Sequence, residues 1–566
     1  MFKPNKNFLN RMRKLLIFFT FLILSSACKK PSVQVISESI YEDKMKAAWI
    51  GQMVGVGWAA VTEFKWIGDI IPEDKIPEWD NNMVNQFDQD DLYVEMNFMA
   101  SLEKHGIDVP VRRAGINFAN STFGLAAAND RARENLRAGI APPASGHPQF
   151  NINCEDIDYQ IESDYSGIVA PGMPQVPVNL GEKFGSLMNY GDGIYAGQFI
   201  GGMYAAAYFE NDIRAIINKG LECIPDSSLY ALCVHDVISW YEQDSVNWQG
   251  TWKKIVDKYY KTLEYQPYHR ATPKAWAGID AKLNGAFAVL GLLYGHGDID
   301  STFYISARCG FDSDCNPSSA LGVLFTAKGL SNIPEKYYSA LNEKRRFSDS
   351  DYTFPELVSV SKKLTEEFIK EQGGKIEKRK DGQNYYVIPL RQPVLPELKK
   401  SWQPEVLNES DIRFGDSEKE AILFLPSASF NEILQKFAPG WLINNATTKA
   451  TPELISFNNR DNVLQMAFLE NNSCSFRGEL MVPEIANPKL NIKISNEPGK
   501  TWTMRILLNW HQIYSVEVND KLTSGGWYDV SCDLSEYAGK KLFVLIQGNE
   551  GSGEDSKVLL NDFVIQ

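Results

Sequence analysis

The sequence has little positive charge and few histidines for its 566 residues. Its 57 Lys and Arg are outnumbered by 71 Asp and Glu, which gives a formal net charge of -14. Because nucleic-acid binding depends on clustered basic side chains that neutralise phosphates, this balance argues against a DNA or RNA partner. Only 6 histidines are present, and no CxxC pair or Cys/His cluster has the spacing of a zinc site.

Several common catalytic motifs are also missing. The chain has no GxSxG elbow, no phosphate-binding P-loop and no GxGxxG after a strand, so acyl transfer and dinucleotide chemistry lack support. The apolar run near the N-terminus, residues 15–24, is also too short for a membrane-spanning helix, which needs about 20 residues.

The N-terminus has the order of a secretory signal peptide, because basic residues precede the apolar run and small residues then lead to Cys28. A buried helix is the alternative interpretation, and the basic flank argues against it. The Leu-Ser-Ser-Ala-Cys segment resembles a bacterial lipobox, which implies lipidation of Cys28. We therefore expect a signal peptide at 1–27, a tether at 28–40, and a lipid anchor in the bacterial cell envelope, on the periplasmic side or the cell surface.

The two halves of the chain differ in hydrophobic pattern. Small and apolar residues in helix-length stretches predict a mainly helical domain, assigned to 41–405. Short alternating stretches between Gly, Asn, Asp and Pro turns predict an all-β sandwich over 415–566. The predicted fold class is therefore multi-domain α + β, a helical domain followed by a jelly-roll sandwich.

Particular segments carry these patterns. The expected helices are 44–61, 91–104, 194–209, 281–294, 318–328 and 354–371. The expected strands are 490–494, 515–518, 542–546 and 558–565. A polar, Pro-rich excursion at 141–174 contains acidic residues that alternate with other residues from 156 to 164, which fits a functional loop, a half-buried strand or a solvated loop face.

Two acidic clusters lie beside helix-like runs: Asp90 with Asp91, and Asp312 with Asp314. Carboxylates in these positions would lie at helix N-termini, where free amides and the helix dipole favour anions. Four hard oxygen donors suit Mg²⁺, Mn²⁺ or Ca²⁺ better than zinc. The alternative for each cluster is a helix cap beside a solvated carboxylate. An EF-hand is excluded, because Pro317 replaces its essential glycine and Val323 its bidentate glutamate.

The order of these clusters in an Ala/Gly-rich helical domain resembles the ADP-ribosylglycohydrolase family, whose early motif is Thr/Ser-Asp-Asp and whose late motif is Gly-Asp-Thr-Asp-Thr. Gly51, Gly55 and Glu63 in GQMVGVGWAAVTEF have the spacing of the family's opening helix and following glutamate. The segment 189–193, Asn-Tyr-Gly-Asp-Gly, is similar to its central glycine-bearing motif.

The resemblance implies an all-α orthogonal bundle that cleaves a glycosidic bond at an anomeric carbon. It implies that Glu63 and Asp91 act as catalytic carboxylates and that one or two Mg²⁺ or Mn²⁺ ions are bound, with Ca²⁺ also possible. The expected metal ligands are Asp90, Asp91, Asp312, Asp314 and the carbonyl oxygen of Gln89. The expected substrate-binding residues are Asp192, Asn189, Cys315, Asn316, Asp156 and Asp158.

Three residues depart from the family pattern: Gln89 and Cys315 replace hydroxyl residues, and Val56 replaces an aspartate. A thiol is a poor ligand for Mg²⁺, so the number of metal ions stays open. If carboxylates are added from elsewhere, the candidates are Asp192 and the acidic residues Asp156, Asp158 and Glu162, for each of which a structural role is the alternative.

The C-terminal half carries its own resemblance. The segment 527–540, WYDVSCDLSEYAGK, resembles galactose-binding-like jelly rolls, which often accompany secreted carbohydrate-active enzymes. Trp441, Trp502 and Trp510 are candidates to stack on sugar rings, with packing in the sandwich core as the alternative.

We therefore expect a metal-dependent glycohydrolase that cleaves an N- or O-glycosidic bond of an ADP-ribosyl, ribosyl or other glycoside in the cell envelope. The alternative is a catalytically inactive carbohydrate-binding protein on the same scaffold, favoured by Gln89, Cys315 and the appended sandwich. The expected partners are a saccharide or ADP-ribose-like small molecule and, through Cys28, the membrane; neither nucleic acid nor a protein partner is predicted.

Overall fold

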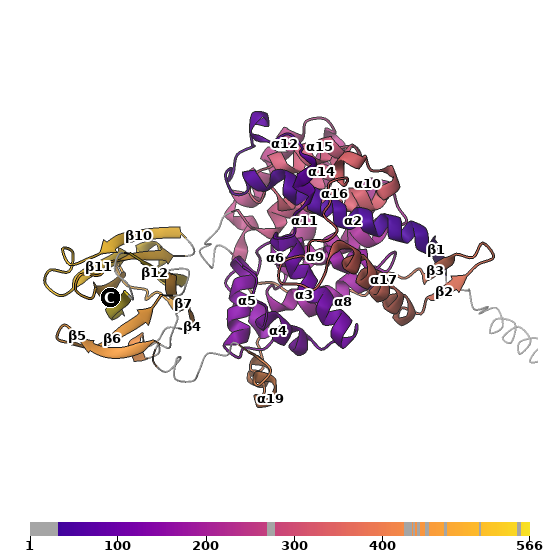
Figure 1. The fold of residues 1–566 in the computed structure, drawn as a ribbon. Coiled ribbons are helices and arrows are strands. Elements are labelled where there is room, and N and C mark those ends of the chain that lie inside the picture. The colour runs from indigo at the N-terminus through magenta and orange to yellow at the C-terminus, as the bar shows by residue number, and fades with distance from the viewer. Residues whose placement is uncertain are drawn as a thin grey trace, which may run out of the picture.

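The structure, a computed structural model, describes residues 32–268, 278–423, 433, 436–438, 442–447, 452–468, 473–508, 511–551 and 556–566. The predicted signal peptide and Cys28 lie outside the described residues, so export and lipidation stay predictions. Figure 1 shows the helices gathered in one body and the strands from residue 442 onward in another. Among the described residues, no helix combines the length and the apolar character needed to cross a membrane.

The helical body contains a central set of long helices surrounded by shorter ones. Its helices are α2 Glu38–Ala59, α3 Asp90–His105, α4 Val111–Ala119, α5 Ala127–Arg137, α6 Asp158–Ile161, α7 Asp164–Ile168, α8 Gln175–Phe184, α9 Asp192–Ala207, α10 Ile213–Leu221, α11 Leu229–Gln243, α12 Trp248–Ile255, α14 Ala281–Tyr294, α15 Ile299–Arg308, α16 Cys315–Lys328, α17 Phe354–Glu371, α18 Glu409–Ile412 and α19 Asp416–Lys419. The predicted helices correspond to α2, α3, α9, α14, α16 and α17.

A small antiparallel sheet orders the start of the helical body. Its strands β1 Val33–Ser37, β2 Lys375–Lys378 and β3 Asn384–Pro389 lie in the order β1-β3-β2. The hydroxyl of Ser37 then accepts a hydrogen bond from the backbone N–H of Ile40 and caps α2, which begins at Glu38. The stretch expected to be a tether, 28–40, is therefore ordered from Val33 onward, because pairing with β3 satisfies its backbone.

Helices α2 and α16 form the buried centre of the helical body and are packed unusually closely. A Cβ added at Gly55 would lie 2.4 Å from the backbone O of Pro317, and one added at Gly51 would lie 2.6 Å from the backbone O of Leu321. The Lys44 ammonium, on α2, donates hydrogen bonds to the backbone O of Ala207 and Ala327. Lys44 thereby ties α2 to the C-terminal turns of α9 and α16.

Because of this close packing, we expect a Gly→Ala substitution in α2 to destabilise the protein, although the same change usually stabilises a helix. Ala in place of Gly ordinarily stabilises a helix by about 1 kcal/mol, but Gly55→Ala is expected to lower the free energy of unfolding by roughly 1–3 kcal/mol, because the new methyl meets backbone that cannot move aside. Urea denaturation of the full chain measures the change. Gly124→Ala is the control, since its nearest neighbour would be the Tyr93 Oη at 3.8 Å; equal stability of Gly55→Ala and wild type would contradict the packing argument.

The acidic excursion is neither a half-buried strand nor a solvated loop. Residues 156–164 form α6, a turn and the start of α7, and all of them are buried. The backbone N–H of Tyr159 donates to Asn189 Oδ1 at 3.0 Å, and the Asn189 side-chain amide donates to the backbone O of Asp156 at 2.8 Å. These bonds fold the segment back on itself and hold its carboxylates inside the helical body.

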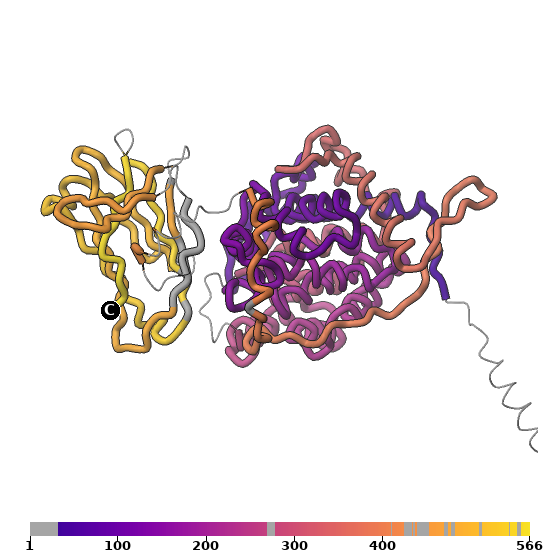
Figure 2. The backbone as a smooth tube through the Cα atoms, turned by 90° about the horizontal axis from the view of Figure 1, so that it is seen from below, coloured from indigo at the N-terminus to yellow at the C-terminus, as the bar shows by residue number. Residues whose placement is uncertain are grey.

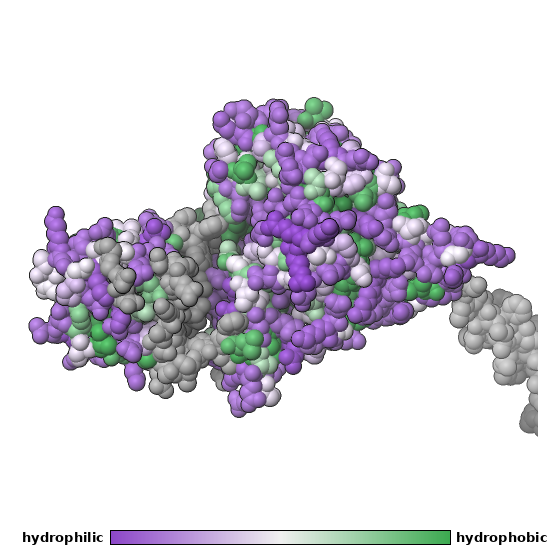
Figure 3. Space-filling model, viewed as in Figure 1, coloured by the Kyte–Doolittle hydropathy of each residue, from purple (hydrophilic) through white to green (hydrophobic). Residues whose placement is uncertain are grey.

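After β3 the chain crosses the surface of the helical body, as Figure 2 shows. The backbone N–H of Lys399 donates to the Tyr195 hydroxyl at 2.7 Å, and Arg112 pairs with Glu418 at 2.6 Å. Residues 415–423, expected to belong to the sandwich, therefore pack on the helical body instead. Figure 3 shows a face dominated by hydrophilic side chains, with the hydrophobic ones in small separate areas.

The C-terminal body is a sandwich of two antiparallel five-stranded sheets, with strand orders β10-β9-β12-β7-β4 and β11-β8-β13-β6-β5. Its strands are β4 Leu442–Thr447, β5 Glu453–Phe457, β6 Arg460–Ala467, β7 Ser473–Met481, β8 Lys489–Ser495, β9 Trp502–Leu508, β10 His511–Val518, β11 Tyr528–Asp533, β12 Lys541–Glu550 and β13 Lys557–Ile565. Trp502 is fully buried in the core and donates to the backbone O of Ser495, so it is not a sugar-stacking surface. Trp441 and Trp510 lie outside the described residues.

Candidate active site

The loop before α16 is held in a strained backbone conformation. Phe311 has φ 60°, an uncommon value for a residue with a side chain. Its backbone N–H donates to the O of Trp66 at 2.7 Å, and its own O accepts from the N–H of Phe64 at 3.1 Å. The Phe311 ring packs against those of Phe287 and Tyr260. These contacts determine the backbone direction just before Asp312, so the strain serves to orient the acidic cluster.

The first acidic cluster lies at the start of α3, where Asp90 and Asp91 occupy the first turn and Gln89 is the N-cap residue. Asp91 is 1% exposed, and the thiol of Cys315 donates a hydrogen bond to its Oδ2 at 3.2 Å. This contact joins the N-termini of α3 and α16, so the two clusters predicted from distant parts of the sequence meet in space.

Cys315 acts in this site as a neutral donor. Burial, together with the charges of Asp312 and Asp91, raises the pKa of the thiol well above its usual value. The sulfur therefore keeps its proton at neutral pH, whereas soft metal binding needs a thiolate. The neutral thiol donates a hydrogen bond, as a hydroxyl does. Cys315 can therefore fill the same structural role as the threonine of the family pattern.

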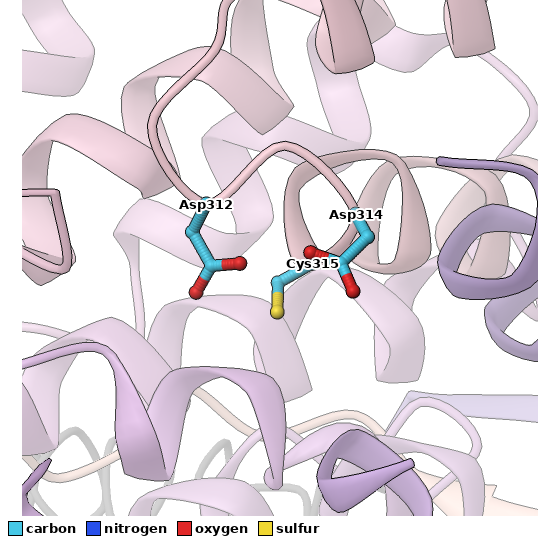
Figure 4. A group of neighbouring side chains, drawn as sticks. All are labelled: Asp312, Asp314 and Cys315. Carbon is cyan, nitrogen blue, oxygen red and sulfur yellow. The ribbon is translucent and has the colours of Figure 1, made fainter. Parts of the chain in front are cut away.

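The acidic residues fit a bound cation. Asp312, Asp314 and Cys315 offer ligand atoms within 4.8 Å of one another, and their side chains point toward one shared space (Figure 4). Within the described part of the chain, Oδ1 of Asp91, Asp312 and Asp314 is in each case buried without a hydrogen-bond partner. Because unpaired buried carboxylates are strongly disfavoured, this group could hold a metal ion, and a cation would satisfy all three oxygens.

A cavity of about 720 Å³ opens onto this group. Asp90, Asp312, Cys315 and Glu63 line it. The apolar part of the wall comes from Phe64, Ile157, Ile161 and Ile279. A polar end beside an apolar wall is the usual construction of a small-molecule site.

Glu63 follows a short 3₁₀ turn, Ala60–Thr62, at the end of α2. The Thr62 hydroxyl donates to the backbone O of Ala59 at 2.7 Å and shares a 2.8 Å hydrogen bond with the Ser313 hydroxyl. Partial removal from solvent, and then the negative charges of Asp314 and Asp90, raise the pKa of Glu63 to about 8. This carboxyl is therefore positioned at the acidic group and can carry a proton near neutral pH.

The acidic excursion also reaches the cavity, where Asp156 and Asp158 form part of the wall. Burial and the charge of Asp156 raise the pKa of Asp158 well above its usual value. Burial, then the charges of Asp158 and Asp90, do the same for Glu162. The carboxylates near this cavity therefore form a larger acidic set than the four residues of the two motifs.

Six of the predicted residues do not line the cavity: Asp91, Asp314, Asp192, Asn189, Gln89 and Asn316. Asp192 accepts a hydrogen bond from the backbone N–H of Tyr230, and the positive charge of Lys282 acts on it. Asn189 uses its amide to hold the backbone of the acidic excursion, and the Asn316 amide donates to the backbone O of Gly310. Asp192 and Asn189 therefore hold neighbouring backbone inside the helical body, and their expected contact with substrate stays a prediction.

Helix α5 provides cavity residues that sequence reasoning missed. Asn129, Asp130, Arg133, Glu134 and Arg137 all line the cavity. Their helical spacing places them on one face, but charged residues at such spacing also describe a solvated surface. Arg133 donates to the backbone O of Phe123 at 2.6 Å, and Arg137 donates to the backbone O of Ala119 at 2.8 Å. The cavity wall therefore carries positive as well as negative charge.

Fold and site together define a mainly helical scaffold with a candidate carboxylate metal centre next to a small-molecule cavity. The sequence matches the family described as ADP-ribosylglycohydrolase over residues 37–373, which is more than half of the chain. The chain therefore belongs to the ADP-ribosylglycohydrolase family. Membership implies a hydrolase and suggests glycohydrolase activity.

Solved structures with low sequence identity match both bodies. One titled as an ADP-ribosylglycohydrolase-related protein complex is 14% identical, covers 58% of this chain and 98% of that chain, and gives a TM-score of 0.36. For the sandwich region, TmCBM61 in complex with beta-1,4-galactotriose is 12% identical and covers 23% of this chain and 89% of that one, with a TM-score of 0.17. A CBM4 structure is 13% identical and covers 25% and 97%, with a TM-score of 0.16. A comparison with curated proteins finds no match.

Proposed function

We propose that this protein is a metal-dependent glycohydrolase of the cell envelope that uses Mg²⁺ or Mn²⁺ to cleave an N- or O-glycosidic bond. The observation that carries the proposal is that Oδ1 of Asp91, Asp312 and Asp314 is buried without a hydrogen-bond partner among the described residues, next to a cavity that Asp312 and Glu63 line. The substrate class is an ADP-ribosyl, ribosyl or other glycoside. The proposed localisation in the cell envelope is based on the lipobox-like sequence before Cys28.

The residues of the site divide the chemistry between them. Asp91, Asp312 and Asp314, with Asp90 beside them, would hold the ion, which when bound orients vicinal sugar hydroxyls and lowers the pKa of a coordinated water. Glu63 exchanges a proton with the attacking water or the departing group, because its raised pKa lies close to neutral pH. The apolar wall of Phe64, Ile157 and Ile279 limits the access of bulk water to the reacting bond.

A screen of glycosides and ADP-ribose conjugates, with Mg²⁺, Mn²⁺ and Ca²⁺ tested in parallel and EDTA as the blank, tests this function. We expect hydrolysis of at least one substrate, abolished by EDTA and restored by the cation. Glu63→Gln is expected to lower kcat by roughly 10²–10⁴-fold, as loss of a general acid or base does, with little change in cation affinity. Glu356→Gln, on the exposed start of α17, is the matched control and should leave the rate unchanged.

The alternative, an inactive carbohydrate-binding protein, predicts a different result in the same experiment. Saccharide binding by the full chain without turnover of any glycoside, with or without divalent cation, would support it and contradict the hydrolase. Hydrolysis that persists in EDTA would instead contradict the metal dependence but would still support a glycohydrolase.

A further inference from the structure

Asn129 holds two carboxylates of the acidic excursion at once. Its backbone N–H donates to Asp158 Oδ1 at 2.8 Å. Its side-chain amide donates to Glu162 Oε1. One residue of α5 thereby fixes both carboxylates, and each is left with its second oxygen.

These second oxygens are buried and have no hydrogen-bond partner in the described part of the chain. They are Asp158 Oδ2 and Glu162 Oε2. The Asn129 Oδ1 atom is likewise buried and without a hydrogen-bond partner among the described residues. The three side chains are 5%, 0% and 3% exposed, respectively. Asn129 and Asp158 also line the cavity, so the trio lies next to it.

The surroundings of this trio are negative. The charges that act on Glu162 are those of Asp158, Asp90 and Asp91, and the charge that acts on Asp158 is that of Asp156. Among the described residues, the largest charge effects on either carboxylate come from other acidic groups. Two buried carboxylates in such surroundings are costly by several kcal/mol, so a bound cation or a retained proton must compensate them.

We propose that Asn129, Asp158 and Glu162 bind a divalent cation at a site separate from the Asp312–Asp314–Cys315 group. Two carboxylates and an amide carbonyl form an all-oxygen donor set, which selects Mg²⁺, Ca²⁺ or Mn²⁺ and disfavours zinc or copper. The ion lies on the cavity wall made by α5 and α6, where hydroxyl or phosphate oxygens of a bound molecule could complete its coordination. The site adds an ion to the cavity and does not depend on hydrolysis.

Mn²⁺ binding to the full chain tests this proposal through its stoichiometry. Equilibrium dialysis with metal analysis, and EPR of the bound ion, give the number of Mn²⁺ ions per chain. Glu162→Gln and Asp158→Asn, which keep the shape of each side chain, are each expected to bind one ion fewer than wild type. Asp314→Asn is expected to retain one bound Mn²⁺, and Glu182→Gln, a carboxylate on α8 paired with Lys399, should match wild type.

Two outcomes would overturn the proposal. The first is wild-type Mn²⁺ stoichiometry and affinity in both Glu162→Gln and Asp158→Asn. That result would mean that Asp158 and Glu162 share protons and do not bind a cation. The second is complete loss of Mn²⁺ binding in Asp314→Asn. This comparison of Asp314→Asn with wild type does not require the Glu162 and Asp158 variants to fold. Failure of the hydrolase proposal appears separately, as absence of turnover with unchanged Mn²⁺ binding.

Discussion

Asp314→Asn is expected to lower the glycohydrolase rate by at least about a thousandfold, equivalent to roughly 4 kcal/mol of transition-state stabilisation. The substitution removes one negative charge from the buried group and leaves the volume almost unchanged, so the site loses affinity for the cation while the fold persists. The same variant is expected to unfold at a higher temperature than wild type in EDTA, because a neutral amide replaces a buried carboxyl that lies among other carboxyls and whose Oδ1 has no hydrogen-bond partner among the described residues. Opposite effects on activity and stability identify a functional carboxylate.

Kinetic assays and thermal melting of the same preparations measure both effects. Asp416→Asn is the control, since this aspartate is fully exposed on α19 and should change neither quantity. Asp91→Asn provides an independent variant on the other helix. Full activity in both Asp314→Asn and Asp91→Asn would remove the carboxylate centre from the reaction.

Stability of the cation-free protein is expected to fall as pH rises from about 5 to 8. Burial raises the pKa of Asp314 to about 6 and partial burial raises that of Glu63 to about 8, whereas unfolded carboxyls titrate near pH 4. Between these values the folded state binds more protons than the unfolded state, so the free energy of unfolding decreases with increasing pH until the folded groups have titrated. A buried carboxyl group costs little stability while it is protonated and destabilises the folded state once it is ionised.

A divalent cation is expected to reverse this trend, because it binds the ionised carboxylates of the folded state only. At about 100 times its Kd a single ion adds about 2.7 kcal/mol, so the melting temperature should rise by several degrees at pH 8 and by less at pH 5.5. Differential scanning calorimetry with EDTA or Mg²⁺ at both pH values measures the four melting temperatures. Identical melting temperatures with EDTA and Mg²⁺ at pH 8 would contradict cation binding, and Asp314→Asn should show a weakened response.

The site residues that sequence reasoning identified were those next to helix starts. Asp90, Asp91, Asp312 and Asp314 could be predicted, because carboxylates that precede long apolar helical runs occupy helix N-termini wherever the helices lie. Glu63 was identified through the resemblance of its spacing after Gly51 and Gly55 to the family's opening helix. These features are local, and local geometry is encoded by neighbouring residues.

Helix α5 and the acidic excursion could not be assigned in this way. Arg133 and Arg137 have the spacing of a solvated helix face, and only the packing of α5 turns that face toward the cavity. The alternation from 156 to 164 matched a strand equally well, yet hydrogen bonds to Asn129 and Asn189 fold it into short buried helices. Asp192 resembles a site residue by motif, and only the tertiary structure shows that it accepts a hydrogen bond from the Tyr230 backbone.

The sequence alone determined that this protein has a helical domain followed by a β domain and that two acidic clusters begin two of its helices. Tertiary structure decided which faces of those helices meet. The close approach of α2 and α16 and the contact of Cys315 with Asp91 bring together carboxylates that lie far apart in the chain. A period-two or 3.6-residue pattern records which side of an element is buried but not which element buries it, so a site made from several helices becomes visible only when they are packed.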